Sequence, residues 1–353
     1  APNNDIPPLI NNLLPWTKWC RSNKNLGGQI PGAFHHTSSA YTAAAEHPLM
    51  NGSICTSWED SGLHNQMWIL HHICACEYSW NPGSTDIDTW IDRLYKNYFG
   101  PQEYAMRECQ HLLQQNAQFF DDTFERRVWH YGYIGRMHIP DFPREGLEFN
   151  PFFIKEYGNY VKDAKLHLQL LDRADSILNK NIELGAKHAH DLEIMLSCTA
   201  LMRVNAELIV CMAEWEKLLS DASLVYHHAD KKRALQNLRQ IETLLENHLT
   251  RKEQVYADLV TLWEKTRLPK GFSTATKAYV YKRERARHLA NKTPDMRYLV
   301  YDMDKLDIQA YLDRLITYNN NYEQLEVKQV DTTLKTTAET IVNTKTKTTA
   351  ALA

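Results

Sequence analysis

The sequence predicts a mostly α-helical protein that begins with a loop-rich region holding a few short strands. Three long segments, near residues 153–183, 188–222 and 228–266, carry apolar side chains at the three- and four-residue spacing of a helix. Residues 1–50 are instead rich in Pro, Gly, Asn and Ser, which favours loops and short strands. The composition changes between about residues 81 and 101, and we expect the main structural boundary there.

The composition is that of a globular protein. Of the 353 residues, 43% are hydrophobic and 24% are charged, and the formal net charge is −3. Because there is no basic excess, nucleic acid is not an expected partner. The oligomeric state is left open by the composition.

The cysteines and histidines do not form a metal-ligand pattern. Seven cysteines without a repeating spacing argue against a disulfide framework and are typical of small core residues. The pair Cys74 and Cys76 is too closely spaced for a zinc site, and the adjacent pairs His71-His72 and His227-His228 point apart on a helix or strand. The sequence also contains no Gly-rich phosphate loop and no Gly-x-Ser-x-Gly elbow, so we predict no metal and no cofactor.

The N-terminal segment does not have the pattern of a signal peptide. The chain starts Ala-Pro-Asn-Asn, without a charged stretch followed by an apolar one. We also expect no membrane partner, because no uninterrupted apolar run approaches about 18 residues. The missing initiator Met is most simply explained if the chain is a piece of a longer protein.

The first hundred residues predict one strand and two helices. Residues 52–58 form a compact β-prone run. A helix is expected after Gly62 and should stop at Asn81-Pro82-Gly83, a strong helix breaker. A second helix should open at Asp86, where acidic residues suit the helix dipole, and end at Gly100-Pro101.

The rest of the chain is predicted to form helical domains followed by a tail. We expect a helix over 101–127, an aromatic loop over 128–152 and then the three long helices, which should pack as a bundle. Their apolar stripes are predicted to be core, including Leu235, Leu238, Ile241, Leu245 and Leu249 in the third helix. The loop aromatics are expected to pack between the remnant of a barrel and the bundle, with a sugar-binding rim as the alternative. The predicted divisions are residues 1–100, a helical bundle domain over 101–271, a helical extension over 272–328 with helices near 275–290 and 306–320, and a threonine-rich tail over 329–353.

Three side chains at the end of the predicted strand form the candidate binding site. Trp58, Glu59 and Asp60 precede the turn at Gly62, and in parallel βα folds ligands bind beyond the carboxyl ends of the strands. An indole packs on the apolar face of a pyranose ring, and carboxylates accept hydrogen bonds from its hydroxyl groups. The pattern therefore favours a sugar. A core Trp followed by two helix-capping acids is the structural alternative.

The same region resembles glycoside hydrolase family 20, the β-N-acetylhexosaminidases, and within it the hexosaminidase D-like branch. The residues that carry the resemblance are Gly52, Trp58-Glu59-Asp60, Asn65, Trp68, Glu77, Trp80, Asp88 and Arg93-Leu94, with Gly32-Ala33-Phe34 and Thr56-Ser57 for the branch. Trp263, Thr266-Arg267 and Lys270-Gly271 are similar to the ending of that branch. The resemblance implies that residues 1–100 hold the last strands of a truncated (β/α)8 barrel, followed by an all-helical C-terminal bundle domain.

The resemblance also implies roles for individual residues. Trp58 matches the aromatic wall of the N-acetylhexosamine subsite, and Asp60 matches a carboxylate that binds sugar hydroxyls. The remaining substrate-binding candidates are Glu59, His64, Phe34 and His35. The implied partner is a glycan with a terminal N-acetylhexosamine.

The catalytic pair of that family is not present in this sequence. Family members use substrate-assisted retaining hydrolysis, in which an adjacent Asp-Glu pair orients the acetamide and transfers the proton. No Asp-Glu dipeptide occurs in the 353 residues. A (β/α)8 barrel takes about 250 residues, so residues 1–100 supply only its end. We therefore expect the C-terminal portion of a glycosidase, inactive alone, with no catalytic residue in this chain.

Two other hypotheses are consistent with the sequence. The chain could be a self-contained, mostly helical interaction or scaffold protein whose first hundred residues form a loop-rich cap. It could also belong to another retaining hexosaminidase or to a hyaluronidase-type enzyme with a helical appendage.

Overall fold

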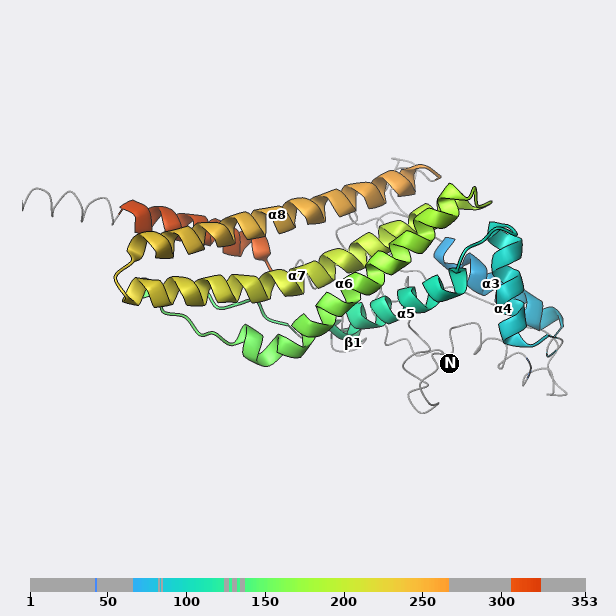
Figure 1. Ribbon diagram of the computed structural model, residues 1–353, viewed down its shortest axis with the longest axis horizontal. Coiled ribbons are helices and arrows are strands. Elements are labelled where there is room, and N and C mark those ends of the chain that lie inside the picture. The colour runs from blue at the N-terminus through green and yellow to red at the C-terminus, as the bar shows by residue number, and fades with distance from the viewer. Residues whose placement is uncertain are drawn as a thin grey trace, which may run out of the picture. The chain divides into compact units, whose positions relative to one another are not determined.

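The computed structural model describes residues 42, 66–81, 83, 85–123, 127–128, 132–133, 137–266 and 306–324. The chain forms two compact units. The first unit comprises Ala1–His138, Tyr157–Val210 and Thr250–Leu306, and the second comprises Ile139–Glu156, Cys211–Leu249 and Asp307–Ala353. Three long helices each contribute to both units: α6 (Phe153–Glu183), α7 (Ala189–His227) and α8 (Lys231–Glu264) (Figure 1).

Within the described residues, the helices that the sequence predicts are present with bounds close to the expected ones, while the helix predicted near 275–290 and the tail over 329–353 lie outside the described residues. The first three are α3 (Gln66–Trp80), α4 (Ile87–Phe99) and α5 (Met106–Thr123). Asp86 caps α4, because its Oδ2 accepts hydrogen bonds from the Thr89 amide and hydroxyl, both at 3.1 Å. Gly100 ends α4 with a φ of 113°, a left-handed conformation that favours glycine. A further helix spans residues 308–324, against a prediction near 306–320.

The prediction of a truncated (β/α)8 barrel is wrong. In the part of the chain that the structure describes, the strands are β1 (Arg127–Val128) and β2 (Gly132–Tyr133), and nearly everything else is helical. The two strands pair antiparallel, Arg127 with Tyr133 and Val128 with Gly132. Barrel strands are parallel and need a crossover of a dozen or more residues between them, whereas the strands of this antiparallel pair are only three residues apart in the sequence. The β-prone run 52–58, on which the strand prediction fell, lies outside the described residues.

The first unit has a core built from α5, α6, α7 and the end of α8. Its buried side chains recur every three or four residues, and include Cys109, Leu113, Phe120, Ala164, Leu171, Leu178, Cys198, Leu201, Leu208 and Leu259. Asn205 interrupts the apolar stripe of α7, as the sequence shows, and its side-chain amide donates to Thr123 Oγ1 at 3.2 Å. That hydrogen bond joins α7 to the end of α5.

Polar contacts fix the relative positions of the helices in the first unit. Arg203 on α7 donates to Asp172 Oδ1 and Asp175 Oδ2 on α6, at 2.7 and 2.6 Å. Also on α6, His167 stacks on Phe119 with ring centroids 4.2 Å apart, and its Nδ1 lies 3.0 Å from Asn116 Oδ1. Burial lowers the pKa of His167 to about 4, so the imidazole is neutral at neutral pH and packs as an uncharged ring.

The second unit is organised around Trp215, which is fully buried. Its Nε1 donates to the Tyr311 hydroxyl at 3.0 Å, and that hydroxyl donates to the Asp141 carbonyl at 3.1 Å. Burial raises the pKa of Tyr311, so the hydroxyl keeps its proton. Next to Trp215, the buried Glu216 accepts hydrogen bonds from the Phe153 and Ile154 amides at the start of α6, at 2.6 and 2.8 Å.

The aromatic loop packs on the C-terminal helix where the structure describes it. The Phe142 ring lies 5.0 Å from Tyr311 and 6.0 Å from Tyr318, and the Arg314 guanidinium sits 4.0 Å over it. A 3₁₀ turn, η1 (Glu145–Leu147), follows. Phe142 therefore packs against other side chains, as expected, but its partner is the helix over 308–324 and not a boundary between a barrel remnant and the bundle.

Among the described residues, the helix α7 is long and apolar enough to cross a membrane. However, 72% of its most apolar 18-residue stretch is buried in the structure. Burial of that kind is what the core helix of a bundle requires.

Candidate functional site

The six substrate-binding residues predicted from the sequence are Trp58, Glu59, Asp60, His64, Phe34 and His35, and all lie outside the described residues. The structure therefore does not test their proposed roles. The described part nearest to them in sequence is α3, which ends on Trp80, an indole 91% exposed. A shallow hollow of about 460 Å³ lies along one face of α3 and is lined by Ile69, His72, Ile73, Cys76, Glu77 and Trp80.

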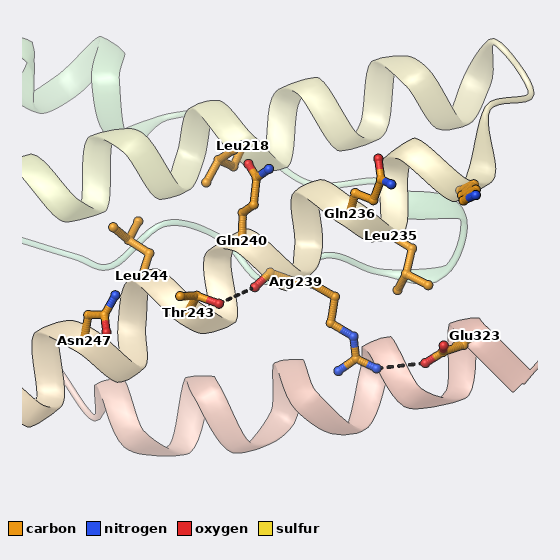
Figure 2. Close-up of a pocket in the computed structure, with 10 residues that line it drawn as sticks. Leu218, Leu235, Gln236, Arg239, Gln240, Thr243, Leu244, Asn247 and Glu323 are labelled. Carbon is orange, nitrogen blue, oxygen red and sulfur yellow. Dashed lines mark hydrogen bonds and ion pairs between the residues drawn. The ribbon is translucent and has the colours of Figure 1, made fainter.

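The larger candidate site is a groove along α8 in the second unit, which we call the α8 groove. It has a volume of about 910 Å³. Its lining residues are Leu218, Lys232, Leu235, Gln236, Arg239, Gln240, Thr243, Leu244, Asn247 and Glu323 (Figure 2). Eight of them belong to α8, one to α7 and one to the helix over 308–324.

The sequence of α8 explains why these residues face outward. Leu238, Ile241 and Leu245 are fully buried, so they define the core side of the helix. The lining residues recur at three- and four-residue spacing from Lys232 to Asn247, on a side of the helix turned away from that core. At 1.5 Å per residue, this stripe is about 22 Å long.

Arg239 forms one wall of the α8 groove and is held by four acceptors. Its Nη1 donates to both Glu242 carboxylate oxygens at 2.9 Å, and its Nη2 donates to Asn320 Oδ1 at 2.8 Å. Its Nη2 also donates to Glu323 Oε2 at 3.0 Å, as Figure 2 shows. Hydrogen bonding to Glu242, and then to Glu323, raises the pKa of Arg239. Asn319, fully buried, donates to Glu242 Oε1 at 2.7 Å and completes the link between the two helices.

The remaining lining groups are suited to recognition by packing and hydrogen bonding. Leu218, Leu235 and Leu244 supply apolar surface, and the amides of Gln236, Gln240 and Asn247 supply donors and acceptors. Thr243 Oγ1 already donates to the Arg239 carbonyl at 3.2 Å. Lys232 is exposed and forms no ion pair with another residue that the structure describes, so it leaves a positive charge at one end of the stripe.

The sequence analysis missed the α8 groove. It assigned Leu235 to the core stripe with Leu238, Ile241 and Leu245, whereas Leu235 is only half-buried and lines the groove. A usable signal was the run of amide and hydroxyl residues at positions 236, 240, 243 and 247, which mark one continuous face of the helix. Glu323 was out of reach of such a pattern because it is 84 residues from Arg239.

Metal binding finds no support in the described residues, among which no group of three or more His, Cys, Asp or Glu side chains is placed to hold an ion. The described cysteines are not in disulfide bonds: Cys74, Cys109, Cys198 and Cys211 are buried and Cys76 is exposed.

Comparison of the chain with protein-family models, with curated proteins and with solved structures gives no match in any of the three. The likeness to glycoside hydrolase family 20 therefore stays a prediction, based on the residues quoted for it.

Proposed function

We propose that the described helical part of this chain is an interaction module, and that the α8 groove binds an amphipathic helix of a partner polypeptide. The observation that carries the proposal is the groove itself, a stripe about 22 Å long with leucines beside amide side chains. A helix of four turns laid along it would bury the leucines and pair with the amides, which is the usual mode of helix-in-groove recognition.

The walls of the groove favour binding because they are held in place before a partner arrives. Arg239 is fixed by Glu242, Asn320 and Glu323, so little side-chain freedom is lost on association. The charge of Arg239 is compensated by these neighbours, whereas Lys232 is not paired with a described residue. The preferred partner helix therefore carries an acidic residue at the end that meets Lys232.

The test is site-specific photocrosslinking in cells that express the full chain. A benzophenone side chain at Gln240 is expected to give a covalent adduct, and mass spectrometry should locate it on a helical, amphipathic segment of one partner. Lys232→Glu should lower the adduct yield roughly fivefold, the effect of losing one favourable charge contact of about 1 kcal/mol.

The matched control places the crosslinker at Lys162, an exposed position on α6 in the first unit. The proposal is contradicted if both positions give the same adducts, if the adduct from Gln240 is a second copy of this chain, or if Lys232→Glu leaves the yield unchanged.

A second candidate function follows from the family resemblance. We propose, as the alternative, that the chain is the C-terminal portion of a glycosidase that removes terminal N-acetylhexosamine, with its Asp-Glu pair outside this chain. The supporting observation is that α3 spans Gln66–Trp80 and so carries Glu77 and Trp80, two of the residues on which the resemblance rests.

The glycosidase proposal is tested by two measurements. The purified chain should not release the chromophore from a chromogenic N-acetylglucosaminide, because it lacks the acid and base groups of substrate-assisted hydrolysis. The coding sequence upstream of Ala1 should encode an Asp-Glu pair. Turnover by the chain alone, or an upstream sequence without that pair, contradicts this proposal and leaves the interaction proposal standing.

A further inference from the structure

A second hollow, in the first unit, combines one aromatic ring with a polar helix face. It has a volume of about 400 Å³ and is lined by Tyr104, Ser176, Asn179, Lys180 and Glu183. The last four lie on α6 at positions i, i+3, i+4 and i+7, so they share one face of that helix, and all four are exposed. Tyr104 comes from the loop before α5 and is 43% exposed.

The backbone of Tyr104 is clamped by a buried amide. Asn181 is fully buried; its Oδ1 accepts from the Tyr104 amide and its Nδ2 donates to the Tyr104 carbonyl, both at 2.8 Å. The same Nδ2 donates to the Ile177 carbonyl within α6 at 2.8 Å. The loop residue is therefore tied to α6 through main-chain groups, independently of its own side chain.

Glu108 on α5 also ties this part of the first unit to α6. Arg173 forms a two-point contact with Glu108, Nε to Oε1 and Nη2 to Oε2, each at 2.8 Å. Hydrogen bonding to Glu108 raises the pKa of Arg173. With its backbone held by Asn181, Tyr104 presents a half-exposed ring beside the polar stripe.

We propose that this hollow binds a neutral pyranose ring of a glycan, with the apolar face of the sugar on Tyr104. Carbohydrate hydroxyl groups would pair with Ser176, Asn179 and the Lys180–Glu183 couple, in which Nζ and Oε2 are 3.3 Å apart. An apolar ligand would leave these polar groups unpaired and is disfavoured. An anionic ligand is also disfavoured, because Glu183 already compensates the charge of Lys180.

The proposed sugar site does not depend on either function proposed above. Its residues lie in the first unit, whereas the α8 groove lies in the second. It also uses none of the residues that carry the resemblance to glycosidases, so it stands if the chain has no part in hydrolysis.

The experiment is saturation-transfer NMR on the full chain with the methyl β-glycosides of glucose and of N-acetylglucosamine as probes. Saturation transfer to the ring protons is expected with at least one probe, with weak affinity. Tyr104→Ala should weaken binding roughly tenfold, because the aromatic contact is lost. Asn179→Ala should weaken it several-fold, and Tyr104→Phe should retain most of it.

Leu166→Ala is the matched control, since Leu166 is 51% exposed on the same helix and does not line the hollow. Thermal denaturation checks that each variant folds. If Tyr104→Ala does not fold, Asn179→Ala still tests the proposal. The proposal is overturned if neither probe receives saturation from the wild-type chain. It is also overturned if Asn179→Ala and the folded Tyr104 variant bind as tightly as Leu166→Ala does.

Discussion

Trp215→Ala is expected to lower the free energy of unfolding by about 3–5 kcal/mol, the range for removal of a fully buried aromatic side chain. The indole is 0% exposed, its ring centroid lies 4.1 Å from that of Tyr311, and its Nε1 donates to the Tyr311 hydroxyl. The variant leaves both a cavity and an unpaired acceptor. Guanidinium denaturation followed by circular dichroism measures the change.

Trp215→Phe separates the packing of the indole from its hydrogen bond, and a variant of the exposed Leu224 serves as the control. Trp215→Phe keeps most of the packing and removes the N–H donor, so it should cost about 1–2 kcal/mol. Leu224→Ala, at a residue 58% exposed on the same helix, should change stability by less than about 0.5 kcal/mol. A loss below about 1 kcal/mol for Trp215→Ala would show that the indole is not central to the second unit.

Glu216→Ala is expected to cost about 2–4 kcal/mol. The carboxylate is 2% exposed and accepts from the Phe153 and Ile154 amides, the first of them buried. Its removal leaves both donors at the start of α6 without their acceptor, and each orphaned buried donor costs about 1–3 kcal/mol. The favourable charge at the helix N-terminus is lost as well. The loss is measured by chemical denaturation.

The neighbouring carboxylate provides the matched control for Glu216. Glu214 is exposed on α7 and forms only a surface ion pair with Lys217 at 3.6 Å, so Glu214→Ala should cost less than about 0.5 kcal/mol. Glu216→Gln retains one acceptor oxygen and should fall between the two. Equal losses for Glu214→Ala and Glu216→Ala would refute the capping role.

The long helices could be predicted because their determinants are local. Three apolar residues of the predicted stripe of α7, Ile194, Cys198 and Leu208, lie at helical spacing and are buried. The predicted ends near 183, 222 and 266 fall close to the observed ends at Glu183, His227 and Glu264. A helix-ending residue such as Gly100 ends the helix through its own backbone conformation, so its position can be predicted from the sequence.

The barrel prediction failed because it inferred how strands pair in the tertiary structure from local β-propensity and a family resemblance. Strand pairing depends on partners distant in the chain, and a short β-prone run does not specify them. The aromatic loop shows the same limit, since a composition rich in Phe and Tyr indicated packing but not the partner. Phe142 packs against Tyr311, which is 169 positions later in the sequence.

The sequence by itself determined which segments of this protein are helical and which of their faces are apolar, because three- and four-residue spacing encodes both locally. Which outward faces line the two proposed binding sites depends instead on the tertiary structure. The α8 groove needs Leu218 of α7 and Glu323 beside α8, and the Tyr104 hollow needs Asn181 to hold a loop against α6. Each surface is created by contacts between residues far apart in the chain, and helical periodicity carries no information about such contacts.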